Sequence, residues 1–223
     1  ITLGPDGTFY CTDDGDHTVR QCTSDGKVLM TIGVPGKPSE PHSGRPFHRC
    51  TDVAIDPKTG DLYVSDGYGN SNVHKFSPDG KLLFSWGTPG TGPGEFNIVH
   101  NIATDKDGYV YVADRENHRI QVFDSSGKFE TQWVNLHRSC AISISYEQHV
   151  YIGELGAGMR VNQNVPNIGP RISVMTTGGD LLARIGRGYG LEVGQFIAPH
   201  GLCVDSRGNI YVAEVAHTNI SHF

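Results

Sequence analysis

The segment HNIATDKDGYVYVADRENHRIQVF (residues 100–123) decides the fold class. It contains an apolar strand, an Asp-Gly turn, an aromatic strand, an acidic turn and a further apolar strand. Apolar and polar residues alternate with a period of two in each strand, and the turns hold Gly, Asp and Asn, which suit positive φ or Asx bonding. The segment therefore predicts short β-strands joined by tight turns.

The same pattern recurs in four other places along the chain. The repeats align on equivalent tyrosines that lie 40 to 60 residues apart: Tyr10, Tyr63, Tyr111, Tyr151 and Tyr211. Most repeats continue into one more strand after a Ser/Asp-Gly turn, as in SPDGKLLFSWG, which gives four strands per unit. Four-stranded units in a regular array are typical of the blades of a β-propeller.

The repeats cover almost the whole chain. The units span about 1–33, 48–87, 99–133, 137–186 and 198–223, and we expect them to form a single all-β propeller domain over residues 1–223. We expect six blades, five of them recognisable here, with the N-terminal part of the ring missing; a five-bladed ring is the alternative. The segment AGMRVNQNVPNIGPR in the fourth unit predicts a loop insertion.

The composition limits the classes of partner that we expect for this protein. The formal charge is −6, and the 18 basic residues are scattered singly, so we expect no nucleic-acid partner. No stretch is apolar enough to predict a membrane span. The five cysteines contain no CxxC pair, which argues against a zinc ribbon. Cys11 and Cys22 flank a hairpin, and whether they are bridged stays open. The compartment is open as well, with a secreted or periplasmic location slightly favoured.

The start of each innermost strand carries the candidate metal ligands. The residue eleven before the equivalent tyrosine is His100 in the third unit, Cys140 in the fourth and His200 in the fifth; Thr51 takes this place in the second unit, which has one extra turn residue. In the first unit this place lies two positions before Ile1. Histidines on alternate blades would converge on the propeller axis. Three of them suit catalytic Zn²⁺, so we expect His100 and His200 to bind zinc and a third histidine to precede Ile1.

These histidines also have a plainer interpretation. Polar residues on innermost strands commonly bind channel water, and Cys140 is either a fourth ligand or a small buried residue. Three further histidines lie in the hairpin turns of the repeat, where structural capping is expected: His17, His118 and His217.

The acidic turns supply a second group of candidates. Tyr68 and Arg115 occupy turn tips where the fold requires neither residue, which makes both candidates for substrate contact. The alternative for Arg115 is a salt bridge to Glu116 or to a neighbouring blade. His48-Arg49 and His137-Arg138 precede inner strands and could add positive potential at the same mouth.

The repeats resemble the NHL repeat family, whose core motif matches YVADRENHRIQVF (residues 111–123). The segments TDVAIDPKTGDLYVSDGYGNS, HNIAT and APHGLCVDSRGNIYVAEVAHTN resemble one branch of it, the peptidyl-α-hydroxyglycine α-amidating lyases. That resemblance implies a six-bladed propeller with zinc held by three histidines, among them His100 and His200. It also implies Tyr68 as catalytic base and Arg115 as anchor for a small-molecule or peptide C-terminal substrate. The implied reaction cleaves a C–N bond to give an amide and glyoxylate.

Three positions depart from that branch. Gly201 stands where the animal enzymes carry an acidic residue for structural calcium, so there is little support for calcium. Ala198 replaces a methionine, and Gly69 replaces one cysteine of a disulfide. Two other functions stay open: a non-catalytic NHL interaction module, and a propeller lactonase or other hydrolase. Against the hydrolase, the inner strands start with His, Thr and Cys instead of the carboxylates and Asn that calcium favours.

Overall fold

The computed structural model describes residues 1–156 and 165–215, and the chain divides into two compact units, Ile1–Asn135 and Leu136–Phe223. Among the described residues, the regular secondary structure consists of β-strands and one 3₁₀ turn, as expected for the predicted all-β fold. The four-stranded sheets and the last hairpin are antiparallel, and within each of them a strand pairs with the next one along the chain. This meander order is what a propeller blade requires.

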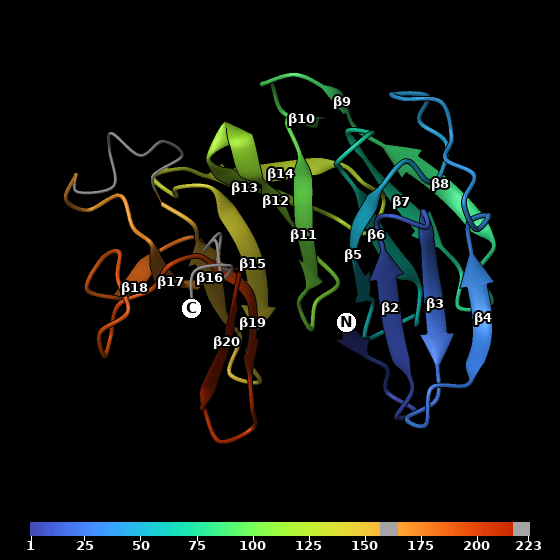
Figure 1. Cartoon of the computed structure of the whole chain (residues 1–223). Coiled ribbons are helices and arrows are strands. Elements are labelled where there is room, and N and C mark those ends of the chain that lie inside the picture. Colours follow the sequence, from blue (N-terminus) through green and yellow to red (C-terminus); the bar gives the residue numbers. More distant parts are fainter. Residues whose placement is uncertain (157–164, 216–223) are drawn as a thin grey trace, which may run out of the picture. The chain divides into compact units, whose positions relative to one another are not determined.

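The first unit contains three four-stranded sheets, which Figure 1 shows in blue to green. The first sheet comprises β1 (Thr2–Leu3), β2 (Phe9–Asp13), β3 (Thr18–Cys22) and β4 (Val28–Ile32). The second comprises β5 (Cys50–Ile55), β6 (Leu62–Asp66), β7 (Asn72–Phe76) and β8 (Leu82–Trp86). The third comprises β11 (Val99–Thr104), β12 (Val110–Asp114), β13 (Arg119–Phe123) and β14 (Phe129–Trp133). A short parallel pair, β9 (Thr88–Pro89) and β10 (Glu95–Phe96), links the second and third sheets, and the 3₁₀ turn η1 (Arg115–Asn117) joins β12 to β13.

The second unit contains a four-stranded fourth sheet and, among the described residues, a two-stranded fifth sheet. The fourth comprises β15 (Ser139–Ile144), β16 (His149–Glu154), β17 (Arg171–Thr176) and β18 (Leu181–Ile185), and the fifth is the hairpin β19 (Pro199–Val204) and β20 (Ile210–Glu214). The all-β, propeller-type fold is confirmed, whereas the number of blades and the single-domain assignment stay predictions.

Apolar side chains from neighbouring sheets form the cores of the first unit. One cluster joins the first and second sheets and includes Tyr10, Val19, Phe47 and Phe76. A second joins the second and third sheets and includes Phe123. Burying a large apolar side chain contributes about 1.5–3 kcal/mol, so these inter-sheet contacts hold the blades against one another.

A carboxylate at the end of the second strand orders each sheet from the second to the fifth. Asp66, Asp114, Glu154 and Glu214 each accept a hydrogen bond from a backbone N–H in the segment just before the inner strand, at 2.6–3.0 Å. Burial raises the pKa of Asp114, against the opposing effects of the Asn97 amide N–H and the Arg119 guanidinium. Arg119 Nε lies 2.7 Å from Asp114 Oδ2. The repeated acidic residue therefore has a structural role in fixing where each inner strand begins.

In the described part of the chain, no helix is long and apolar enough to cross a bilayer.

Candidate functional site

The inner strands of four sheets share an irregularity near their first residues. The register slips between Cys50/Asp52 in β5, Val99/Asn101 in β11, Ser139/Ala141 in β15 and Pro199/Gly201 in β19. The residue passed over in each case is Thr51, His100, Cys140 or His200. A β-bulge commonly redirects one side chain out of the sheet pattern. The structure therefore places the four aligned residues at one equivalent, specially directed position.

At this position in the second sheet, Thr51 makes structural hydrogen bonds. Its hydroxyl lies 2.8 Å from the Val99 carbonyl oxygen of the neighbouring inner strand and 2.8 Å from Ser65 Oγ. The hydroxyl therefore ties β5 to β11 in the place where other sheets present a histidine or a cysteine.

His100 has Tyr68 as its partner within the first unit. The Tyr68 hydroxyl lies 3.0 Å from His100 Nε2, and the two rings meet edge-on with centroids 5.7 Å apart. His100 is buried, with 4% of its surface exposed, whereas Tyr68 is partly exposed. The proposed base and one proposed metal ligand are thus in direct contact.

Gly67 makes this contact sterically feasible. A Cβ at Gly67 would lie 1.8 Å from the Val99 carbonyl oxygen and 2.6 Å from the Val99 nitrogen. Only a residue without a side chain lets the β6–β7 turn approach β11 this closely. The Tyr68 N–H donates to the Arg49 carbonyl at 3.3 Å, which fixes the turn from the other side.

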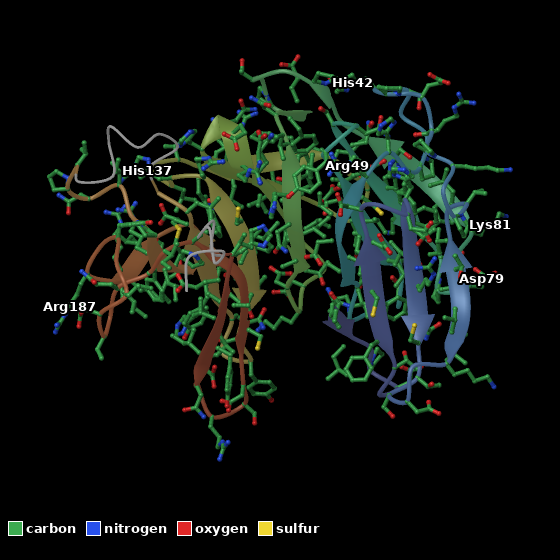
Figure 2. All side chains as sticks on the ribbon, in the orientation of Figure 1. His42, Arg49, Asp79, Lys81, His137 and Arg187 are labelled. Carbon is green, nitrogen blue, oxygen red and sulfur yellow. The ribbon has the colours of Figure 1, made fainter. Side chains whose placement is uncertain are left out.

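Two guanidinium groups lie against the Tyr68 ring. Arg49 Cζ is 5.1 Å and Arg115 Cζ 5.7 Å from the ring centroid, within the range of cation–π attraction. Arg49 lies just before β5 and is labelled in Figure 2. It forms a salt bridge with Asp14, in which Arg49 Nη2 lies 2.6 Å from Asp14 Oδ2. Arg115 pairs with Glu116, Nε to Oε1 2.8 Å. The predicted alternative for Arg115, a salt bridge to Glu116, is therefore present together with its position over Tyr68.

Tyr68 and Arg115 occupy the same place in successive sheets. The Arg115 N–H donates to the Ile98 carbonyl as the Tyr68 N–H does to Arg49, and the equivalent N–H donors in the next two sheets belong to Leu155 and Val215. A polar residue at this turn tip is therefore not required by the fold, which agrees with the sequence argument.

The second unit brings two more candidates together. Cys140 at the start of β15 is buried and His200 at the start of β19 is partly buried. Cys140 Sγ and a ring nitrogen of His200 lie within 4.8 Å of each other. Thiolate sulfur and imidazole nitrogen are both ligands that zinc accepts.

Other residues singled out in the sequence have structural positions. His118 caps η1 in the left-handed region, at φ 56°. His17 Nδ1 accepts a hydrogen bond from the Arg49 N–H at 3.1 Å. His217 and the insertion residues 157–164 lie outside the described residues. Cys11 and Cys22 are free thiols: Cys11 lies opposite Arg20 and Cys22 opposite Phe9, so the two cysteines are diagonal neighbours.

The surroundings of Gly69 explain its departure from the amidating-lyase pattern. A Cβ at Gly69 would lie 1.8 Å from His48 Cδ2, and the Gly69 N–H donates to the His48 carbonyl at 2.9 Å. The His48 ring thus occupies the space beside residue 69.

Comparison with protein families agrees with the repeat structure. The family described as NHL repeat matches residues 47–76, 96–123 and 196–223. The chain carries NHL repeats.

Two curated relatives match nearly the full chain. It is 30% identical to human NHL repeat-containing protein 3 over 97% of the chain and 62% of that protein, and 29% identical to Drosophila melanogaster peptidyl-alpha-hydroxyglycine alpha-amidating lyase 1 over 100% of the chain and 43% of that protein. The NHL-repeat chain therefore spans about half the length of these relatives. Among solved structures, virginiamycin B lyase from Staphylococcus aureus superposes with a TM-score of 0.65 at 16% identity, over 96% of this chain and 61% of that chain. This last likeness concerns the fold.

Arg49 and Gly67 contribute more to the surroundings of Tyr68 than the sequence predicts. The sequence indicates only positive potential at Arg49, whereas its stacking on Tyr68 depends on a loop conformation with φ 64° at Arg49. Gly67 carries a usable signal, because the second unit has an extra turn residue and a tyrosine directly after this glycine.

Proposed function

We propose that the protein is a metal-dependent carbon–nitrogen lyase, most similar in chemistry to the peptidyl-α-hydroxyglycine α-amidating lyases. The observation that carries the proposal is the contact between Tyr68 and His100, because it joins a potential proton acceptor to a potential metal ligand. The similarity to the fly lyase over the whole chain supports the same reaction class.

The proposed metal ligands are His100, Cys140 and His200, the residues that occupy the aligned bulge position in β11, β15 and β19. The donor set of two imidazoles and one thiolate fits zinc in particular, because Zn²⁺ accepts N and S ligands and can leave a position for substrate. Bound Zn²⁺ would polarise the substrate's α-hydroxyl group. The sequence leaves Cys140 as either a fourth ligand or a small buried residue, and this proposal includes it among the ligands.

The side chains around Tyr68 have complementary tasks in this proposal. The Tyr68 oxygen accepts the proton of the α-hydroxyl group as the C–O bond becomes a carbonyl. The C–N bond breaks, its electron pair passes to nitrogen, and the proton is delivered there, so the products are a primary amide and glyoxylate. Arg115 binds the substrate carboxylate through its planar guanidinium, and Tyr68 is partly exposed, as contact with a peptide or small-molecule substrate requires.

The test combines metal analysis with turnover of benzoyl-α-hydroxyglycine. We expect stoichiometric zinc, loss of zinc in His100→Ala, and a rate lowered about 10²–10⁴-fold in Tyr68→Phe with zinc retained, because Phe lacks only the proton-accepting oxygen. Arg115→Gln should raise KM more than it lowers kcat.

Glu116→Gln is the matched control, since it removes the charged partner of Arg115 and keeps the guanidinium. A protein that holds no stoichiometric metal and releases no glyoxylate would contradict the proposal and favour a non-catalytic interaction module.

A further inference from the structure

The second unit contains a cavity separate from the residues of the proposed lyase site. Its volume is about 440 Å³, and its lining comes from two segments: residues 165–167 and 169–171, which lead into β17, and residues 184 and 186–189 at and after the end of β18. This volume is within the range of small-molecule sites, roughly 300–1,000 Å³. Three of its lining residues are arginines and none is acidic.

The third sheet has an arginine at the position equivalent to Arg171, with a different set of partners. Arg119 there pairs with Asp114 and donates from Nη1 to Gln132 Oε1 at 2.8 Å. Its Nη2 group reaches the carbonyl oxygens of Gly92 and Glu95 in the linker, both at 2.9 Å. One guanidinium is thus surrounded by oxygen acceptors, and the linker is fastened over it.

The fourth sheet keeps the arginine and changes its surroundings. Arg171 is the equivalent of Arg119, because it pairs with Glu154 through Nε at 2.9 Å and Nη2 at 3.0 Å. Arg184 stands opposite Ser173, as Gln132 stands opposite Gln121. An uncharged acceptor in one sheet is therefore replaced by a second cation in the other.

The linker after β18 adds further groups to the same cavity. Tyr189 pairs with Phe196 as Pro89 pairs with Phe96, but the linker has one more residue than its counterpart after β8. Arg187 lies in this longer stretch, and its side chain passes Gly194, where an added Cβ would lie 3.6 Å from Arg187 Nε. Arg187 is labelled in Figure 2.

We infer that this cavity binds a small-molecule anion, a phosphate or carboxylate group carried on an apolar or aromatic body. Arg171 pairs with Glu154, and Arg184 and Arg187 add two further guanidinium groups to the lining. Arginine suits both groups because its fork binds two oxygens at once. Tyr189, 47% exposed, offers a ring face to the body of the ligand. The site is independent of the proposed lyase function, since it shares no residue with it.

Calorimetric titration of the protein with phenyl phosphate, benzoate and phenol tests this inference. We expect saturable binding of phenyl phosphate or benzoate and no binding of phenol. Which of the two anions binds more tightly will show whether the site prefers a phosphate or a carboxylate group. Arg184→Gln and Arg187→Gln should each weaken binding about tenfold, the effect of one charge-assisted hydrogen bond. Tyr189→Ala should weaken the binding of phenyl phosphate and leave the binding of inorganic phosphate unchanged.

Arg207→Gln is the matched control, because Arg207 is an exposed arginine of the same unit outside the cavity lining. Arg184 and Arg187 are both exposed, so their variants should fold, which thermal unfolding can verify. Equal weakening by the control, or no saturable binding of either anion, would overturn the inference.

Discussion

Replacing Gly67 by alanine is the sharpest test of how the Tyr68–His100 contact is built. The added Cβ would lie 1.8 Å from the Val99 carbonyl oxygen, whereas real Cβ contacts essentially never fall below 3.0 Å. The turn or β11 must therefore move by about 1.2 Å, the difference between these distances. A shift of this size would lengthen the 3.0 Å Tyr68–His100 contact to about 4 Å, beyond hydrogen-bond distance.

Two measurements follow from that displacement. The free energy of unfolding should fall by about 1–3 kcal/mol, as for other overpacked sites. Turnover of benzoyl-α-hydroxyglycine should fall about 10²-fold, because a misplacement of about 1 Å costs that much. Zinc content should be retained, since no ligand is changed.

Gly15→Ala provides the control. Its Cβ would meet only Asp13 Oδ1 at 3.5 Å, an ordinary contact, so stability and turnover should stay near those of the wild type. If Gly67→Ala matched this control in both measurements, the close approach of the turn to β11 would not be what positions Tyr68.

Three other predictions address charge and metal binding. Burial raises the pKa of Asp52 to about 6, above its unfolded value of about 3.9, so the stability it contributes is present below about pH 4 and is lost as pH rises through about 6. Asp52→Asn keeps an acceptor for the Asn101 amide and should raise the free energy of unfolding at pH 7 by up to about 3 kcal/mol, with no gain at pH 4 in urea melts; equal gains at both pH values would refute this. Arg119→Met leaves the buried Asp114 carboxylate without its cation and should cost about 3–5 kcal/mol in chemical denaturation, so a loss below about 1 kcal/mol would show that the other donors suffice. Cys140→Ala should lower zinc affinity at least about tenfold in chelator competition, and unchanged affinity would return Cys140 to the role of a small buried residue.

The sequence predicts the strands well because the turn residues of each repeat can be recognised within that repeat. Asp-Gly turns, period-two alternation and the equivalent tyrosines all depend on neighbours within one sheet, and the strand pairing follows them: Tyr111 lies opposite Ala103 as Tyr63 lies opposite Ala54. The bulge positions can also be located, since they lie at a nearly constant distance from these tyrosines.

Contacts between sheets are harder to predict. The approach of Gly67 to Val99 and the stacking of Arg49 on Tyr68 depend on loop conformation, which repeat alignment does not define. The cavity beside Arg184 escapes the sequence for a related reason. Its charge becomes visible only when Arg184 is matched with Gln132 through the strand register.

The bulge at the start of the inner strands has a consequence for how such a protein can change. Because the passed-over residue makes no regular ladder pair, the identity of its side chain is decoupled from the pairing that holds the sheet. Thr, His and Cys already occupy that one position in this single chain. A lineage of these repeats could therefore exchange one chemistry for another by point substitution, leaving the architecture untouched, and a designer could do the same.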